Sequence, residues 1–361
     1  MSIKFNYLYA CVSIFFNFIF KLELLTNLNG VLIILTFLRI ITKLFHFLPS
    51  EFSHKLALEG LRFITFLGFK IKNDSNSLTL LNINFVNKLG LAAGLDKNGD
   101  YIDSLSALGF GFLEIGTVTP KPQKGNQKPR LFRVKSQKAL VNSMGFNNKG
   151  VEYLVDRVKK RNSDTPLGIS IGKNFNTPIE SALDDYLICL DKVYKLADYV
   201  AVNISSPNTK NLRDLQSKDY IDQFLLSIRE RQLALASLDG YTPILIKISP
   251  DMNEEELRIL SESILENNLD GIICSNTTSH HSHFSGGGGL SGKPLFDSST
   301  LTLELLRRFV GKDLPIIASG GVMDSDSFQK KIDTGANLVQ IYTGFIYEGP
   351  SLVNEIINFR N

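Results

Sequence analysis

The chain has 361 residues, enough for one large α/β barrel with an extension or for two ordinary domains. Its 39 basic and 36 acidic residues give a net charge of +3, and the basic residues are scattered, which argues against a nucleic-acid partner. Cys11, Cys189 and Cys274 have no CxxC or metal-ligand spacing, so neither a disulfide framework nor a structural zinc site is predicted, and a reducing compartment suits them.

Residues 1–47 form an apolar segment that we expect to contact a lipid bilayer. Residues 5–20 are nearly all apolar between two lysines, and residues 31–38 continue the bias. The first run is slightly short for a span and contains Asn6 and Asn17. A spanning helix, a helix lying on the membrane, an uncleaved signal anchor and a cleaved targeting segment therefore remain open.

Residues 48–75 predict a second, amphipathic helical region. Ser50 is a candidate N-cap, and more apolar positions follow it than one buried stripe requires. Such a helix either buries both sides in a core or dips an apolar face into lipid, with His54, Lys55 and Arg62 near the head groups.

From about residue 88 onward, short apolar runs alternate with stretches of helical periodicity. The predicted strands are 88–95, 111–118, 167–171, 199–204, 244–248, 271–275, 315–319 and 338–342. The predicted helices are 150–160, 179–196, 220–236, 254–266, 299–309 and 326–333. Repeating βα units predict that residues 76–361 form one closed (β/α)8, or TIM, barrel of the α/β class. An open doubly wound sheet would need a nucleotide-binding turn, and the glycine spacing of residues 90–94 does not match one.

Polar or glycine-rich residues follow nearly every predicted strand, where such barrels keep functional groups. Gly320-Gly321 and Thr343-Gly344 follow the last two strands, where backbone N–H groups commonly hold a phosphate. With no Walker pattern and no HExxH, a phosphate there indicates a cofactor such as FMN. Lys247 then either places its charge beside the pyrimidine side of the flavin ring or is a buried lysine paired with a carboxylate.

The segment 203–209, Asn-Ile-Ser-Ser-Pro-Asn-Thr, turns a buried strand into a cluster of short polar side chains. Its Asn amides suit a planar polar ligand, and a hydroxyl at Ser205 or Ser206 could meet a substrate proton. The alternative is a strand that ends in an Asx or Ser turn. His280, His281 and His283 lie in a Ser/Gly-rich loop with clustered spacing, which favours a mobile, solvated lid over a metal site, and no metal is predicted.

These motifs together resemble the class 2, quinone-dependent dihydroorotate dehydrogenases over about residues 48–357. The resemblance rests on AGLDKNG (93–99), EIGTVTPKPQKGN (114–126), KPRLFR (128–133), NSMGFNN (142–148), IGKN (171–174), NISSPNTKNLR (203–213), NTT (276–278), GGLSGKP (288–294) and VQIYTGFIYEGP (339–350). It implies an FMN-containing barrel that oxidises (S)-dihydroorotate to orotate and reduces a membrane quinone, the fourth step of pyrimidine (UMP) synthesis. The membrane would be a bacterial inner membrane, on its cytoplasmic side, or a mitochondrial one, and no obligatory protein partner is implied.

The resemblance also implies a role for individual residues. Ser206 would be the base that removes the C5 proton while a hydride leaves C6 for the flavin. Substrate contacts are implied for Lys97, Asn142, Ser143, Met144, Gly145, Phe146, Asn203, Asn208, Asn276 and Thr277. FMN contacts are implied for Ala93, Gly94, Leu95, Asp96, Lys97, Thr117, Ser170, Asn203, Lys247, Ser275, Gly292, Gly320, Gly321, Tyr342 and Thr343. Arg133 and His54 would lie at the quinone site, with residues 48–75 around the tunnel mouth.

Three positions depart from the family pattern. Ser170 stands where an Asn is frequent, Ser143 where an Arg is usual, and Ser275 where a Thr is usual. The Ser275 hydroxyl keeps the contact, whereas Ser170 is expected to need a bridging water. The related soluble class has a cysteine at the position of Ser206, and none of the three cysteines falls in that motif, which favours the quinone branch. Two rival functions of other classes remain: a flavin-free barrel isomerase or aldolase using Lys247, and a catalytically silent membrane scaffold. Within the oxidoreductase class, a soluble enzyme that uses fumarate or a nicotinamide partner also remains, although the apolar amino-terminal extension and the serine base argue against it.

Overall fold

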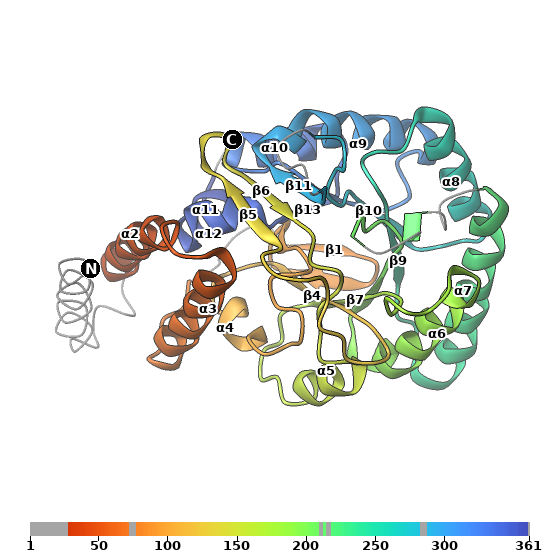
Figure 1. The fold of residues 1–361 in the computed structure, drawn as a ribbon, viewed down its shortest axis with the longest axis horizontal. Coiled ribbons are helices and arrows are strands. Elements are labelled where there is room, and N and C mark those ends of the chain that lie inside the picture. The colour runs from red at the N-terminus through yellow and green to blue at the C-terminus, as the bar shows by residue number, and fades with distance from the viewer. Residues whose placement is uncertain (1–27, 72–76, 209–211, 214–217, 282–286, 360–361) are drawn as a thin grey trace.

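A closed eight-stranded parallel barrel forms the body of the protein in this computed structural model, which describes residues 28–71, 77–208, 212–213, 218–281 and 287–359 (Figure 1). Around the barrel the strands are β3 (Leu89–Leu91), β4 (Phe112–Val118), β7 (Leu167–Ile171), β8 (Tyr199–Asn203), β9 (Ile244–Lys247), β10 (Gly271–Cys274), β12 (Ile316–Ser319) and β13 (Leu338–Ile341). The pairing of Gln340 with Gly90 joins β13 to β3 and closes the barrel. All eight predicted strands are present, so the (β/α)8 prediction is confirmed.

Large and small residues alternate in the barrel interior, and this alternation lets the strands approach. A Cβ on Gly90 would lie 2.2 Å from the Phe112 ring, and one on Gly168 would lie 2.1 Å from the Tyr199 ring. A hairpin of β1 (Leu78–Leu80) and β2 (Ile83–Phe85) packs against this layer through the buried side chain of Phe85. The amino-terminal end of the barrel is therefore filled, which leaves the opposite end for a ligand.

Helices surround the barrel, as βα units require. They are α4 (Ile102–Ser106), α5 (Val151–Val158), α6 (Ala182–Val193), α7 (Lys218–Asp239), α8 (Glu254–Glu266), α9 (Phe296–Val310), α10 (Ser325–Asp333), α11 (Thr343–Glu348) and α12 (Pro350–Ile357), with 3₁₀ turns η2 (Lys135–Gln137), η3 (Ile179–Ser181), η4 (Tyr194–Leu196) and η6 (Lys293–Leu295). The start of α8 coincides with its prediction, because Asn253 and Glu256 form a capping box. The short helices α4, α11 and α12 were not predicted.

A second sheet, also not predicted, lies beside the carboxyl ends of the barrel strands. Its strands are β5 (Leu131–Val134), β6 (Ala139–Asn142) and β11 (Gly289–Gly292), in the order β11-β6-β5. The register pairs Gly289 with Asn142, so two distant segments of the chain meet at this edge.

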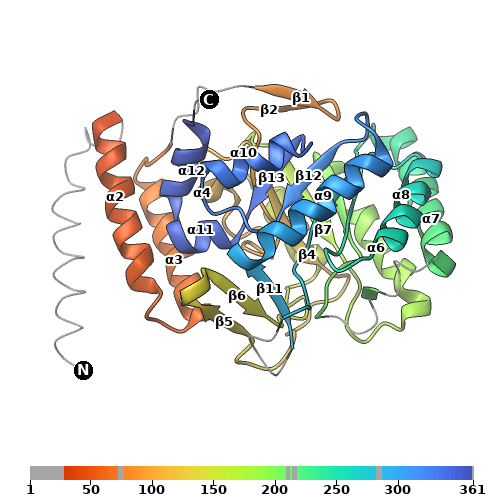
Figure 2. The same cartoon turned by 90° about the horizontal axis from the view of Figure 1, so that it is seen from above.

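Two amino-terminal helices, α2 (Leu28–Phe45) and α3 (Ser50–Phe66), lie side by side (Figures 1 and 2). Helix α2 packs against α11 and α12, and α3 packs against α4 and β5. The predicted N-cap at Ser50 is wrong, since Ser50 is the first helical residue and follows Pro49 without a side-chain cap bond. Most of the predicted membrane segment, residues 1–27, lies outside the described residues. Among the helices that are described, none is long and apolar enough to cross a membrane. The proposed boundaries at residues 47 and 75 stay predictions.

Candidate active site

A cavity with an empty volume of about 1150 Å³ opens at the carboxyl ends of the barrel strands. Twenty of the predicted substrate, cofactor and catalytic residues line it. They are Ala93, Gly94, Lys97, Thr117, Asn142, Met144, Gly145, Phe146, Asn203, Ser206, Asn208, Lys247, Ser275, Asn276, Thr277, Gly292, Gly320, Gly321, Tyr342 and Thr343. The rule that functional groups follow the carboxyl ends of barrel strands therefore predicted most of these lining residues.

Four predicted contact residues lie outside this lining. The Asp96 carboxylate accepts the backbone N–H groups of residues 98, 100 and 101, so it holds the turn after β3, and burial raises its pKa. Leu95 instead faces a second cavity. The Ser143 amide donates to the Arg130 carbonyl. Ser170 is fully buried, with its Oγ 2.9 Å from Thr117 Oγ1, so it supports a lining residue directly, and the expected water bridge to a ligand stays a prediction.

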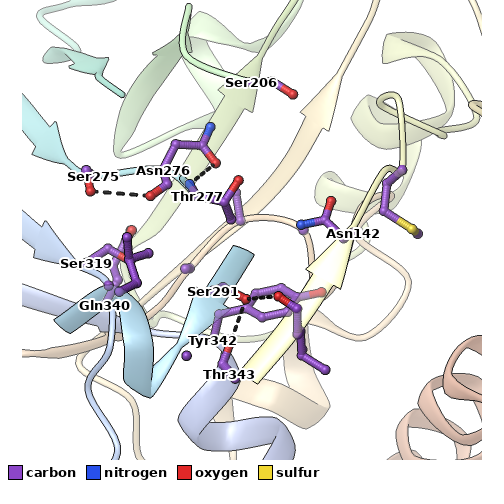
Figure 3. Close-up of a pocket in the computed structure, with 18 of the residues that line it drawn as sticks. Asn142, Ser206, Ser275, Asn276, Thr277, Ser291, Ser319, Gln340, Tyr342 and Thr343 are labelled. Atoms are coloured by element: carbon purple, nitrogen blue, oxygen red, sulfur yellow. Dashed lines mark hydrogen bonds between the residues drawn. The ribbon is translucent and has the colours of Figure 1, made fainter. Parts of the chain in front are cut away.

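Several lining residues were not predicted. They are Ala92, Leu131, Leu140, Ser291, Leu295, Ser319, Val322, Gln340 and Ile341. Gly344, predicted with Thr343 as a candidate phosphate contact, also lines the cavity. Of the unpredicted residues, those next to a predicted residue could have been found from the strand ends, whereas Leu131, Leu140 and Ser291 enter through the second sheet. In Figure 3, Ser291 lies beside Thr343, and their hydroxyl oxygens are 2.8 Å apart.

Ser206 lies on the loop after β8 and is 5% exposed. Its Oγ accepts the backbone N–H of Asn208 at 3.3 Å, which orients the hydroxyl. Among the described residues, no carboxylate or imidazole hydrogen-bonds to this hydroxyl. A proton taken up by Ser206 would therefore leave through water or a neighbouring hydroxyl, as expected from the high intrinsic pKa of a serine.

Asparagine amides form a linked set around Ser206. Asn208 Nδ2 donates to Asn142 Oδ1 at 3.0 Å, and Asn276 Nδ2 donates to Asn203 Oδ1 at 3.2 Å. Asn203 Nδ2 in turn donates to Thr117 Oγ1 at 2.8 Å. Because each amide is held by a neighbour, the groups that remain are presented in fixed directions, as recognition of a planar polar ligand requires.

Lys97 places an ammonium group on the lining of the cavity. Its Nζ donates to the Gly94 carbonyl at 2.6 Å. Burial lowers the pKa of Lys97 to about 8, and the nearby charge of Arg130 acts in the same direction. An anionic ligand would offset both effects and restore the charged form.

Lys247 is a buried lysine paired with a carboxylate, one of the two roles left open by the sequence, and its place beside a flavin ring stays a prediction. Its side chain lines the cavity, and its Nζ lies 3.1 Å from Glu114 Oε1 in a buried ion pair. Glu114 Oε2 also accepts hydrogen bonds from Tyr199 Oη and from Gln340 Nε2. The Oε1 of Gln340 has no hydrogen-bond partner among the described residues, so a buried acceptor remains at the base of the cavity.

The loop after β12 is shaped for a group that approaches the backbone. Gly320 and Gly321 have φ values of +111° and +78°, and a Cβ on Gly321 would lie 2.4 Å from Phe296 Cα. A Cβ on Gly344, after β13, would lie 2.4 Å from the Val322 oxygen. Only glycine fits there, which leaves the backbone accessible to a phosphate. We call the backbone of Gly320 and Gly321 the glycine cradle. This cradle and the unpaired acceptor of Gln340 both fit a flavin nucleotide.

A second, mainly apolar cavity of about 1410 Å³ lies between α2, α3 and the β13–α11 connection. Both residues predicted for the quinone site, His54 and Arg133, line it. Leu131, Leu140 and Tyr342 line both cavities and so form their common wall.

The polar groups of the second cavity are few and unusual. Arg133 Nη1 donates to the Leu48 carbonyl at 2.8 Å and Nη2 contacts Ser53 Oγ, while Nε has no partner among the described residues. Burial, together with the nearby charge of Lys97, lowers the pKa of His54 to about 4, so its imidazole is neutral at pH 7. Burial likewise raises the pKa of Tyr342 to about 12.

The histidine-rich loop shows no metal cluster within the described part of the chain, which contains no group of three or more His, Cys, Asp or Glu side chains that could hold an ion. A ring nitrogen of His281 lies 3.0 Å from the Gly288 carbonyl oxygen. His283 lies outside the described residues.

The fold and the two cavities define a (β/α)8 barrel with a glycine-rich loop after β12 on its polar cavity and an adjoining apolar cavity. Residues 76–359 match the family model for dihydroorotate dehydrogenase. The chain is 49% identical over 322 residues to "Dihydroorotate dehydrogenase (quinone)" of Hamiltonella defensa, an alignment that covers 86% of this chain and 96% of that protein. It is 48% identical over 332 residues to the protein of the same name from Pectobacterium atrosepticum, covering 89% and 99%.

Solved structures agree with the sequence comparison. The crystal structure of DHODH from Eimeria tenella in complex with ferulenol superposes with a TM-score of 0.76 at 32% identity and covers 84% of this chain and 89% of that chain. The ligand-free form of the Eimeria tenella protein gives the same TM-score at 33% identity. The chain belongs to the dihydroorotate dehydrogenase family.

Proposed function

We propose that this chain oxidises (S)-dihydroorotate to orotate and reduces a quinone, with FMN as the bound flavin. The observation that carries the proposal is the pair of cavities that share Tyr342, Leu131 and Leu140 as a wall. A polar site for an anionic pyrimidine adjoins an apolar chamber that suits a lipid-soluble oxidant, so electrons can cross without a second protein. The quinone-dependent names of the curated relatives support this assignment.

Each lining group has a task in this reaction. The Lys97 ammonium meets the substrate carboxylate, and the asparagine amides match the polar edge of the ring. Ser206 accepts the proton from C5 and releases it to water. FMN, when bound in this cavity, would supply the acceptor for the hydride from C6 and the two electrons that, with two protons, convert the quinone to a quinol.

The residues around the flavin hold it in a fixed orientation. Gly320, Gly321 and Thr343 would hold the phosphate of FMN, and Lys247 would lie beside the ring, with its charge partly offset by Glu114. In the second cavity, the unpaired Nε of Arg133 would donate to a quinone oxygen. The apolar side chains of α2 and α3 that line the second cavity would then contact the quinone as well as pack against the core.

We propose further that the chain works at a membrane surface, through α2, α3 and residues 1–47. Phe47, Phe52, Phe63 and Phe66 are exposed on or beside these helices, with Phe66 84% exposed. A bacterial inner membrane, on its cytoplasmic side, fits the bacterial sources of the two relatives named above, and a mitochondrial inner membrane would take its place in a eukaryote.

The decisive experiment replaces the proposed base. Detergent-extracted wild-type protein and Ser206→Ala are mixed anaerobically with dihydroorotate, and flavin bleaching is followed by stopped flow. We expect the variant to keep its flavin spectrum while reduction slows by roughly two orders of magnitude or more, since a positioned base contributes about 10²–10⁴-fold. Ser237→Ala, at an exposed hydroxyl on α7, is the control and should react normally. An unchanged rate in Ser206→Ala would remove Ser206 from the base role, and a colourless wild-type protein would favour the flavin-free isomerase.

A further inference from the structure

Lys331 is a fully buried cation that the reaction above does not use. Its side chain is 0% exposed, its Nζ donates to Ser299 Oγ at 2.7 Å, and the ammonium lies 5.0 Å from the centre of the Phe296 ring. Within the described part of the chain, no carboxylate oxygen lies within ion-pair distance of this nitrogen. Burial lowers the pKa of Lys331 to about 8. A buried ammonium with so few partners is unfavourable unless an anion approaches it.

The partner of Lys331 lies directly behind the glycine cradle. Ser299 Oγ accepts from Lys331 and lies 3.1 Å from the Gly320 carbonyl oxygen and 3.0 Å from the Phe296 carbonyl oxygen, so its single proton is shared between these two acceptors. A Cβ on Gly320 would come 2.7 Å from Ser299 Oγ, so α9 and the loop after β12 are in close contact here. Lys331, near the end of α10, therefore reaches the cradle through a single hydroxyl.

The cradle end of the cavity otherwise has no cation among its described lining residues. The two lysines of the lining are Lys97, on the loop after β3, and Lys247, which is paired with Glu114. A phosphate dianion bound at Gly320 and Gly321 would thus meet backbone dipoles but no countercharge on the lining itself. Lys331, one layer behind, can supply that charge at short range in a region of low dielectric.

We propose that Lys331 is a positioning residue for the cofactor, whose buried ammonium acts through Ser299 and the Gly320-Gly321 backbone to select a phosphorylated flavin over an unphosphorylated one. This inference rests on the proposed function and adds to it the origin of nucleotide selectivity. The hydroxyl of Ser299 orients the carbonyl of Gly320, and the positive charge of Lys331 offsets the negative charge of the phosphate.

The test compares FMN with riboflavin, which lacks the phosphate. Full-length protein in detergent is stripped of flavin and titrated with each flavin by fluorescence quenching, for wild type, Lys331→Met and Lys330→Met. We expect Lys331→Met to weaken FMN binding by on the order of tenfold or more and to change riboflavin binding by less than about twofold. Lys330, exposed on the same helix, is the matched control and should change neither affinity. Equal losses for both flavins, or no loss for FMN, would overturn the proposal.

A measurement on the wild type keeps the proposal testable if Lys331→Met does not fold. Calorimetric titrations near pH 8 in buffers of different ionisation enthalpy report proton uptake on binding. The groups that act on Lys331 are the Cys274 thiol on β10, whose pKa burial raises to about 12, and the Asp297 carboxylate on α9. FMN, whose phosphate is a dianion above about pH 6, should raise the pKa of Lys331 and so take up a fraction of a proton, whereas riboflavin should not.

The outcomes separate this inference from the proposed function. Equal proton uptake with both flavins would overturn the role of Lys331. A wild type that prefers FMN, together with a folded Lys331→Met that keeps the same preference, would remove this inference alone. A wild-type protein that binds neither flavin would instead refute the proposed function.

Discussion

Replacing Arg213 with Met should uncouple two loops of the active site. Its guanidinium donates from Nε to the Ser205 carbonyl at 3.1 Å and from Nη2 to the Thr277 carbonyl at 3.0 Å. Nη1 forms an ion pair with Asp251 Oδ2 at 2.6 Å. One side chain thus joins the loop that carries the proposed base to the loop after β10.

The size of the effect follows from these contacts. The Asp251 side chain is only 8% exposed, although it keeps hydrogen bonds from Thr278 and Ser279 after the change. Hydrogen bonds to charged groups contribute about 1.5–3 kcal/mol each, but the Arg213 side chain is 24% exposed and water replaces part of its contacts. We therefore expect a net loss of about 2–4 kcal/mol in the free energy of unfolding. Misplacement of the two loops should lower kcat/KM for dihydroorotate by about 10–100-fold, equivalent to about 1.4–2.8 kcal/mol.

The assay pairs anaerobic flavin reduction with denaturant unfolding. Arg213→Lys keeps a charge beside Asp251 but cannot bridge both carbonyls, so its rate should lie between those of wild type and Arg213→Met. Arg231→Met removes an exposed ion pair with Asp191 on another face and should cost less than about 1 kcal/mol with no change in rate. If Arg213→Met lost stability yet reduced its flavin at the wild-type rate, the bridge would be structural only and this reasoning would be wrong.

Two further predictions concern the ends of the electron path. Orotate should bind less tightly as the pH rises above about 8, because Lys97 is charged below its lowered pKa and must take up a proton above it, and equilibrium titration of the flavin spectrum would show this. A pH-independent affinity, or the same pH profile in Lys97→Gln, would contradict the role of Lys97. Arg133→Met should raise KM for a short-chain quinone by about tenfold while anaerobic reduction by dihydroorotate is unchanged, since its guanidinium lines only the second cavity. A slower reductive step in that variant would mean that the two cavities do not act separately.

Sequence pattern predicted the barrel well because each barrel strand carries its own local signal. The run 199–203 is buried throughout, and so are 167–171 and 271–274, as expected of parallel strands covered on both faces. Helix α8 was found to the residue, since its capping box and its apolar spacing lie within one short segment. The position of Ser206 and the asparagines followed from the rule that functional groups lie at the carboxyl ends of the strands.

Side-chain direction after a strand end was less predictable. Asp96 and Leu95 adjoin lining residues, yet one caps backbone N–H groups and the other enters the apolar cavity. Loop conformation decides such directions, and the loop is shaped by contacts with other elements. Ser50 failed as an N-cap for a similar reason, because Pro49 takes the cap position and no side-chain cap bond forms.

The sequence by itself determined that eight βα units close into a barrel and that one rim carries the polar chemistry, because strand periodicity and strand-end composition are local properties. Only the tertiary structure decided that β11 pairs with β6, that Glu114 pairs with Lys247, and that Lys331 reaches Ser299. These contacts join residues far apart in the chain, and a local sequence pattern does not tell which distant residues meet. The chamber beside Tyr342 likewise exists only because α2 and α3 pack against the end of the barrel.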